Sequence, residues 1–169
     1  MPLSVRRAGA GRALDSGQYA ARMSPNLPQR RSGGRRLPYT FHPGLPKTDC
    51  PPKGASPMTG VIYRRLRGLP ACKEDFYSHR ETNTPCPAPD CDCWGLSVWV
   101  TLEDVRHALR VYRAFRHSPI IKININPEHG VIMKTGSNRQ PEHRTFWRDI
   151  THDLLPLCVV IDPQKEEGG

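Results

Sequence analysis

Hydrophobic residues recur at helical spacing between residues 102 and 116, and this pattern predicts the main helix of the chain. Its apolar positions, which fall on one face, are Leu102, Val105, Ala108, Leu109, Tyr112 and Phe115. Thr101 is a good N-cap because its hydroxyl can accept a hydrogen bond from the first helical turn. Pro119 prevents the helix from continuing. We therefore expect a helix over about residues 102–116.

Shorter apolar runs on both sides of this helix predict strands. Residues 120–125 alternate between apolar and polar side chains, which is typical of a half-buried strand. The other runs cover residues 61–67, 96–100, 131–135 and 157–162. Residues 126–130 have the composition of a turn, so the strands before and after them are expected to form a hairpin. The last run is almost wholly apolar, which favours a buried strand.

Together these elements predict an α+β fold. We expect an about five-stranded mixed or antiparallel sheet with the helix of residues 102–116 packed on one face, and a short helix near residues 73–79. The domain would span residues 58–164, which is near the usual size of a single domain. Residues 165–169 are expected to be a disordered tail.

Composition and charge change at Met58. Residues 1–57 hold 10 of the 25 Lys and Arg residues but only 2 of the 16 Asp and Glu residues, so they carry most of the net charge of +9. The same segment holds 9 of the 18 prolines and 7 of the 14 glycines. Such a composition buries too little apolar surface to offset the loss of chain entropy. We expect residues 1–57 to be disordered, and the folded part to be nearly neutral.

Three interpretations of this basic segment stay open. It could bind a polyanion, with an affinity that falls as salt is added. It could be a transit peptide, because residues 1–23 are rich in arginine and contain one acidic residue, Asp15. It could also lie outside the native protein, with translation starting at Met58, directly before the first predicted strand.

Neither a signal peptide nor a membrane span is predicted. The apolar core of a signal peptide is missing after Arg6 and Arg7, and no run approaches the ~20 apolar residues that a spanning helix needs. We expect a cytoplasmic protein without membrane contacts, or a protein of an organelle matrix if residues 1–57 are a transit peptide.

Four cysteines lie close together in the chain and suggest a zinc site. They are Cys72, Cys86, Cys91 and Cys93. Thiolates at short spacing on a loop are suitable ligands for tetrahedral zinc, and His79 would be a spare nitrogen ligand. Disulfides are a second interpretation, but without a secretion signal we expect reduced thiols. A loop with incidental cysteines is the third.

Histidine and arginine occur together in three segments that flank the predicted strands. Histidine exchanges protons near neutral pH, and arginine binds phosphate or carboxylate. The candidate catalytic residues are His143, His129 and Arg144. The candidate substrate-binding residues are Arg65, Arg80, His79, Ser97, Trp99, Thr145 and Trp147. If residues 143–148 are extended, His143, Thr145 and Trp147 share one face, which could hold a nucleotide base or a ribose phosphate.

Two functions from different classes are compatible with these features. One is a small intracellular binding or accessory domain, stapled by zinc and acting through partner or polyanion contacts. The alternative is an enzyme, a transferase or hydrolase, that acts on a phosphate-bearing or nucleotide substrate with His and Arg residues. Geometry separates the two: convergence of His79, His129 and His143 with Arg65 or Arg80 in one pocket would favour the enzyme.

Overall fold

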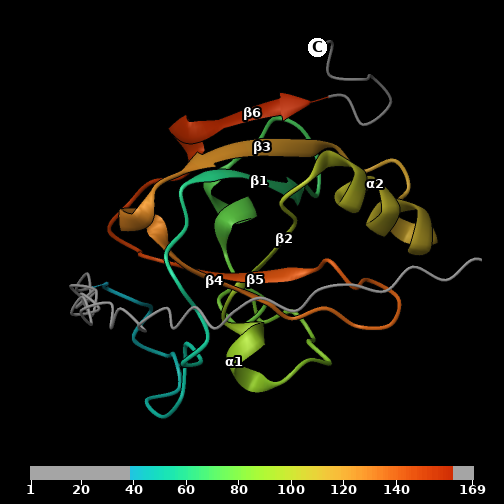
Figure 1. Cartoon of the computed structure of the whole chain (residues 1–169). Coiled ribbons are helices and arrows are strands. Elements are labelled where there is room, and N and C mark those ends of the chain that lie inside the picture. The colour runs from blue at the N-terminus through green and yellow to red at the C-terminus, as the bar shows by residue number, and fades with distance from the viewer. Residues whose placement is uncertain (1–38, 162–169) are drawn as a thin grey trace, which may run out of the picture. The chain divides into compact units, whose positions relative to one another are not determined.

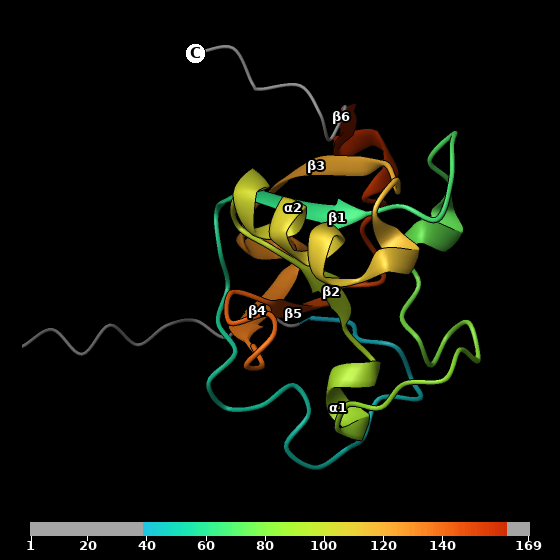
Figure 2. The same ribbon diagram turned by 90° about the vertical axis from the view of Figure 1, so that its right-hand side faces the viewer.

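Two three-stranded antiparallel sheets, stacked one above the other, make up the fold (Figures 1 and 2). The computed structural model describes residues 39–161. In the upper sheet the strand order is β1 (Gly60–Arg65), β3 (Ile120–Ile125) and β6 (Cys158–Ile161). In the lower sheet the order is β2 (Leu96–Val98), β5 (Arg144–Arg148) and β4 (Gly130–Lys134). The class is α+β, but the expected single five-stranded sheet is not formed.

The main core lies between the two sheets. Ile62 and Ile123 of the upper sheet pack with Val98 and Phe146 of the lower sheet, and all four side chains are at most 1 % exposed. Four short 3₁₀ helices connect the strands: η1 (Lys73–Phe76), η2 (Arg113–Phe115), η3 (Pro127–His129) and η4 (Leu155–Leu157). The first of these is the short helix expected near residues 73–79, in a tighter form.

The main helix, α2 (Leu102–Val111), begins where the sequence predicts and ends sooner. The Thr101 hydroxyl accepts a hydrogen bond from the Asp104 amide at 3.1 Å, so the expected N-cap is present. Tyr112 adopts extended backbone angles (φ −105°, ψ 101°) and ends the helix before η2. Val105 and Leu109 bury the apolar face of α2 against Tyr63 and Trp99 in a second core.

The expected hairpin between residues 120–125 and 131–135 is wrong. β3 pairs with β1 and β6, whereas β4 pairs with β5 in the other sheet. Gly130 starts β4 with a φ of 142°, a conformation that side chains disfavour, and an added Cβ would lie 2.2 Å from the Trp147 carbonyl oxygen. The turn therefore sends the chain from one sheet to the other, and this produces two small sheets.

The edges of the two sheets also differ from the sequence prediction. β6 was expected to be buried, yet Val159 and Val160 are 58 % and 45 % exposed because the strand lies at the edge of its sheet. At the opposite edge, Tyr63 of β1 exchanges two backbone hydrogen bonds with Trp99, at 2.7 and 2.9 Å. This bridge joins the two sheets beside α2.

Residues 39–57 belong to the folded part, so the predicted boundary at residue 57 differs from the structure. The Ile150 amide donates to the Thr40 carbonyl at 2.9 Å, and Ser56 pairs with Ile132 of β4. These contacts order a stretch whose composition alone predicts disorder. Residues 1–38 and 165–169, for which disorder is also expected, lie outside the described residues.

Four of the six cysteines form two disulfides. Cys50 is bonded to Cys91, and Cys86 is bonded to Cys93 across the short helix α1 (Asp90–Cys93). The expectation of reduced thiols is therefore wrong for Cys86, Cys91 and Cys93, whereas Cys72 is a free cysteine. Among residues 39–161, no helix has the length and apolar character needed to cross a membrane.

Candidate functional site

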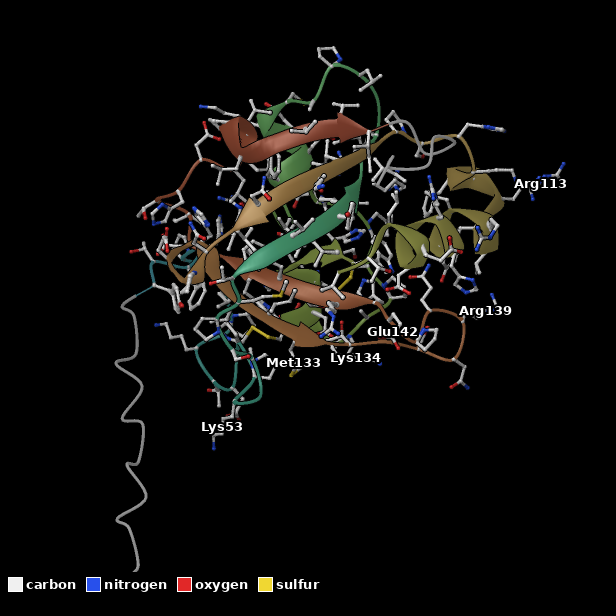
Figure 3. The ribbon with its side chains drawn as sticks, turned by 45° about the horizontal axis from the view of Figure 1, so that its top comes forward. Lys53, Arg113, Met133, Lys134, Arg139 and Glu142 are labelled. Carbon is white, nitrogen blue, oxygen red and sulfur yellow. A yellow bond between two sulfur atoms is a disulfide. The ribbon has the colours of Figure 1, made fainter. Side chains whose placement is uncertain are left out.

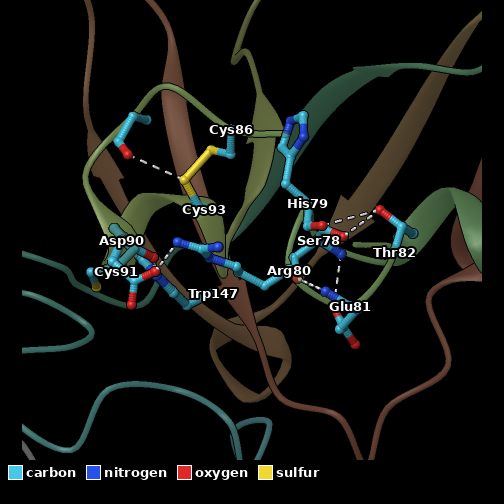
Figure 4. The surroundings of a disulfide bond; sticks show 11 residues. Ser78, His79, Arg80, Glu81, Thr82, Cys86, Asp90, Cys91, Cys93 and Trp147 are labelled. Atoms are coloured by element: carbon cyan, nitrogen blue, oxygen red, sulfur yellow. Dashed lines mark hydrogen bonds and ion pairs between the residues drawn. A yellow bond between two sulfur atoms is a disulfide. The ribbon is translucent and has the colours of Figure 1, made fainter. Parts of the chain in front are cut away.

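A cleft of about 500 Å³ lies where β1 and β2 approach α2. We call it the candidate cleft. One wall is formed by strand residues, a second by α2 and η2, and a third by the loop of residues 86–88. Cys86 belongs to that loop, so the Cys86–Cys93 disulfide ties the third wall to α1 (Figure 4).

Six of the residues predicted for substrate binding or catalysis line this cleft. They are Arg65, His79, Ser97, Trp99, His143 and Thr145. Ser97 and Thr145 are cross-strand partners between β2 and β5, which sets them side by side. The sequence analysis took convergence of three histidines with Arg65 or Arg80 in one pocket as support for an enzyme. This condition is met in part, because His79 and His143 line the cleft with Arg65.

Sequence reasoning missed further residues of the cleft, including Asp92, the one acidic side chain that residues 39–161 contribute to it. Tyr112 and Phe115 were interpreted as core positions of a longer helix, but they lie beyond its end and line the cleft. Arg64 and Thr135 also line it. Arg64 had a signal in the sequence, namely a second arginine directly beside Arg65, whereas Thr135 is an ordinary residue at a strand end.

A chain of hydrogen bonds connects the hydroxyl groups of the cleft to His143. The Thr135 hydroxyl lies 3.0 Å from His143 Nδ1 and 2.7 Å from the Thr145 hydroxyl. If Thr135 donates to Nδ1, the other ring nitrogen of His143 carries the proton. If Nδ1 donates instead, the other nitrogen can accept a proton, so this chain is compatible with both roles.

The surroundings of His143 favour its neutral form. Burial lowers the pKa of His143, and the positive charge of Arg64 lowers it further, while a hydrogen bond with Thr135 opposes the change. The Trp99 ring meets the His143 ring edge-on, with centroids 5.4 Å apart. These surroundings favour the neutral imidazole, which is the form that can accept a proton.

The two adjacent arginines of β1 are held in different ways. Arg64 donates to two carbonyl oxygens, those of Asp75 at 2.8 Å and Ser97 at 2.9 Å. Burial, and next the charge of Arg65, lowers the pKa of Arg64 to about 10. The Arg65 guanidinium lies 4.0 Å from the centroid of the Phe115 ring. Neither arginine forms an ion pair with a carboxylate of residues 39–161.

His79 lies between the candidate cleft and a smaller cavity behind it. Its Nδ1 atom is buried and has no hydrogen-bond partner. Burial lowers the pKa of His79, and the charges of Arg64, Arg67 and Arg65 lower it further.

His129 does not reach the candidate cleft. Its side chain is 7 % exposed, and its Nδ1 accepts a hydrogen bond from the Asn126 amide at 2.8 Å. The His152 ring is its aromatic neighbour, at 5.2 Å. The short 3₁₀ turn η3 needs this contact as a cap, which accounts for His129 without a catalytic role.

Three other predicted site residues also lie elsewhere. Arg144 is on the opposite face of β5 from Thr145, and its Nε atom is buried without a hydrogen-bond partner. Trp147 is 1 % exposed, and its indole donates to the Cys91 carbonyl at 2.9 Å, so it packs against α1. Arg80 forms an ion pair with Asp90 and lines a different cavity.

That second cavity has a volume of about 630 Å³ and lies on the other side of residues 78–82. Figure 4 shows the His79 ring directed away from the Arg80–Asp90 pair. Among its lining residues, Arg148 forms an ion pair with Glu81 at 2.7 Å, and both side chains are largely buried. Lys73 approaches Asp153 at 3.9 Å.

The four-thiolate zinc site expected from the sequence is not formed in this disulfide-bonded structure. Cys86, Cys91 and Cys93 are in disulfides, and a disulfide sulfur cannot serve as a thiolate ligand. Cys72 is free and exposed, and residues 39–161 contain no group of three or more His, Cys, Asp or Glu side chains suited to a metal. Zinc binding by this loop stays a prediction for the reduced chain.

Comparison with known proteins identifies no relative. No protein-family model matches the chain, and neither a curated protein nor a solved structure matches it.

Proposed function

We propose that the candidate cleft binds a nucleotide or a similar phosphate-bearing aromatic molecule, and that the protein is an enzyme acting on it as a transferase or hydrolase. The observation that carries this proposal is the convergence of Arg65, His79 and His143 with three aromatic rings in one cavity of about 500 Å³. Such a volume is in the usual range for small-molecule sites.

The two kinds of side chain suit the two parts of a nucleotide. The rings of Trp99, Tyr112 and Phe115 offer apolar surface for a base. Arg65 and His79 offer positive or hydrogen-bonding groups for phosphate. Arg65 forms no ion pair with a carboxylate of residues 39–161, so its charge is available to an anionic ligand. Within this described part of the chain, the one acidic side chain that lines the cleft is Asp92, whose pKa is raised by burial, which favours its neutral form.

His143 is the proposed general base or acid. Its neutral ring can take a proton from an attacking water or hydroxyl group when Nδ1 donates to Thr135, and the Thr135 hydroxyl is linked in turn to Thr145. Ser97 and Thr145 add hydroxyl groups that can donate to ligand oxygens. Arg65 would bind the anion but take no part in proton transfer.

The disulfides change the cellular compartment that we infer for the protein. Disulfides persist in oxidising compartments and are rare in the cytosol, so the structure favours an oxidising environment over the expected cytoplasmic location.

Ligand binding is tested by calorimetric titration of the full-length, oxidised protein with adenosine 5′-monophosphate and with adenosine. We expect the monophosphate to bind more tightly than the nucleoside. Arg65→Ala removes charged hydrogen bonds worth about 1.5–3 kcal/mol, so the dissociation constant should rise about 10- to 100-fold. Arg113→Ala is the matched control, since Arg113 is exposed beyond the end of α2 (Figure 3) and does not line the cleft. Equal losses in both variants would contradict the proposal.

Catalysis is tested by incubation with a panel of nucleotides and dinucleotides, followed by mass spectrometry of the products. His143→Gln should abolish turnover and leave binding nearly unchanged. His117→Gln is the control, because His117 is exposed and outside the cleft. Turnover that survives in His143→Gln would remove this histidine from the mechanism, and binding without any turnover would reduce the function to that of a binding domain.

A further inference from the structure

Behind His79 lies a small cavity of about 40 Å³, which we call the arginine cavity. It is lined by Arg64, Arg65, Arg67, Asp75, Tyr77 and His79. A single water needs about 10–15 Å³ of such space, so the arginine cavity has room for a few waters or one small oxyanion. Arg64, Arg65 and His79 also line the candidate cleft, so the two spaces share one wall.

The charges around the arginine cavity do not balance. Three guanidinium groups face it, against the one carboxylate of Asp75. That carboxylate is occupied by backbone amides, with Cys72 donating to it at 3.0 Å and Arg67 at 3.5 Å. It forms no ion pair within 4.0 Å with any of the three arginines.

The side-chain hydrogen bonds of the three arginines go to neutral oxygens. Arg64 donates to two backbone carbonyls, Arg65 to the Leu66 carbonyl at 3.3 Å, and Arg67 to the Thr82 hydroxyl at 3.4 Å. Positive charges held this close repel one another, and bringing them together in a partly buried place costs free energy. An anion between them would remove that cost.

We propose that the arginine cavity is a phosphate subsite, and that the ligand of the candidate cleft carries a terminal phosphate group that enters it past His79. This rests on the proposed function for the identity of the larger ligand. Arginine forks match the geometry of phosphate oxygens, and the buried Nδ1 of His79, which has no hydrogen-bond partner among residues 39–161, can donate to the same group when it is protonated.

The subsite predicts a change in the protonation of His79. In the absence of phosphate, burial and the three arginines lower the pKa of His79. The charged and titratable groups that share the arginine cavity with His79 are Arg64, Arg65, Arg67, Asp75 and Tyr77. Those that line only the candidate cleft with it are Asp92, Tyr112 and His143. A bound phosphate adds negative charge beside the ring, so the pKa of His79 should rise when phosphate binds.

The test uses inorganic phosphate as the probe, titrated into the full-length protein and followed by the ¹H–¹⁵N resonances of His79 and by thermal unfolding. We expect saturable binding, a raised His79 pKa and a higher Tm. Arg67→Ala should weaken phosphate binding about 10-fold or more, because Arg67 faces the arginine cavity and does not line the candidate cleft. Arg113→Ala should leave it unchanged.

The outcomes separate this inference from the proposed function. Adenosine monophosphate binding that depends on Arg65 but not on Arg67 would overturn the subsite and keep the nucleotide proposal. Phosphate binding that depends on Arg67, with no binding of any nucleotide, would support the subsite and overturn the nucleotide proposal. A Tm increase without a change at His79, or one equally large in Arg67→Ala, would mean a non-specific salt effect and would also overturn the subsite.

Discussion

The two cavities on either side of residues 78–82 have similar volumes, but the arginines of one form ion pairs and those of the other do not. In the second cavity, Arg148 is paired with Glu81 at 2.7 Å, with its Nε atom buried and without a hydrogen-bond partner among residues 39–161, and Arg80 is paired with Asp90. In the candidate cleft, Arg64 and Arg65 donate only to carbonyl oxygens, and His79 has a buried nitrogen without a partner. Volume alone would point to the second cavity, which is the larger one.

The difference separates charges that stabilise the fold from charges that attract a ligand. An ion pair that is already formed offers little to a ligand, because binding must first break it. A group of like charges without counter-ions is destabilising in the empty protein, and such a group is expected where function requires it. Mutation of a paired arginine of the second cavity should therefore lower stability and leave ligand binding unchanged. Mutation of an arginine of the candidate cleft should weaken ligand binding without an equal loss of stability.

The largest effect is expected on the paired side. Arg148→Ala leaves Glu81 as an unpaired and largely buried carboxylate, and breaking a buried pair in this way costs about 3 kcal/mol. Urea denaturation measures the loss. Ligand binding in the candidate cleft should be unchanged at temperatures where the variant is folded. An equal loss from Arg65→Ala would contradict the distinction between the two sides.

The next largest loss of stability is expected from removal of the Cys86–Cys93 disulfide, which ties the third wall of the candidate cleft to α1. Replacing both cysteines with serine opens a short loop, and the chain-entropy model gives about 2.5 kcal/mol for a loop closed over a separation of 7 residues. Because Cys86 lines the candidate cleft, binding there should weaken as well, whereas the second cavity should keep its ion pairs. Cys158→Ser, which changes a free cysteine outside both cavities, is the control. Unchanged binding in the double variant would show that the loop is not needed as a wall.

A smaller effect is expected from pH. The pKa of His143 is lower in the folded protein than its usual value of 6.5, so the unfolded chain binds more protons at mildly acidic pH. The contribution of His143 to stability is complete above pH 6.5 and is lost as the pH falls below it, by at most about 1.4 kcal/mol per pH unit. Denaturant titrations between pH 7 and pH 5 should show a shallower decline for His143→Gln than for the native protein, and identical slopes would contradict the lowered pKa.

The smallest effect is expected at the surface. Lys134 and Glu142 form an exposed ion pair at 2.7 Å (Figure 3), and solvent screens such pairs strongly. Lys134→Ala should change neither Tm nor ligand binding measurably. A clear loss would mean that the neighbouring Thr135–His143 contact depends on this pair.

Local patterns predicted single elements better than their assembly. The cap at Thr101 and the alternation of residues 120–125 are local, so α2 and β3 begin where the sequence indicates. The separation into two sheets depends on which strands pair, and the positive φ of Gly130 and its close contact with the Trp147 carbonyl, at the start of β4, are visible only in the folded chain. The exposure of Val159 follows from its place at a sheet edge, which an apolar run does not reveal.

The sequence predicted which kinds of side chain the candidate site would contain, but not which of the candidate residues would lie together. Arg65, His79 and His143 were chosen for their chemistry, and the fold brings them together from segments far apart in the chain. His129 and Trp147 were chosen on equal grounds, but they serve as a turn cap and a core residue. Disulfides were the second interpretation of the cysteine cluster, but reduced thiols were preferred because no secretion signal is predicted, and Cys50 lies in a stretch whose composition predicts disorder.

The two disulfides interleave along the chain, since Cys91 lies between Cys86 and Cys93 and is itself bonded to Cys50. The Cys50–Cys91 bond closes a covalent ring over a separation of 41 residues, and β1 lies within that ring. A single protease cut in the exposed stretch of residues 67–70 would open the ring without releasing a fragment. The nicked protein would migrate as one species on a non-reducing gel and as two after reduction. The ring thus keeps β1, with its adjacent arginines, covalently attached to the rest of the molecule even after the backbone is broken.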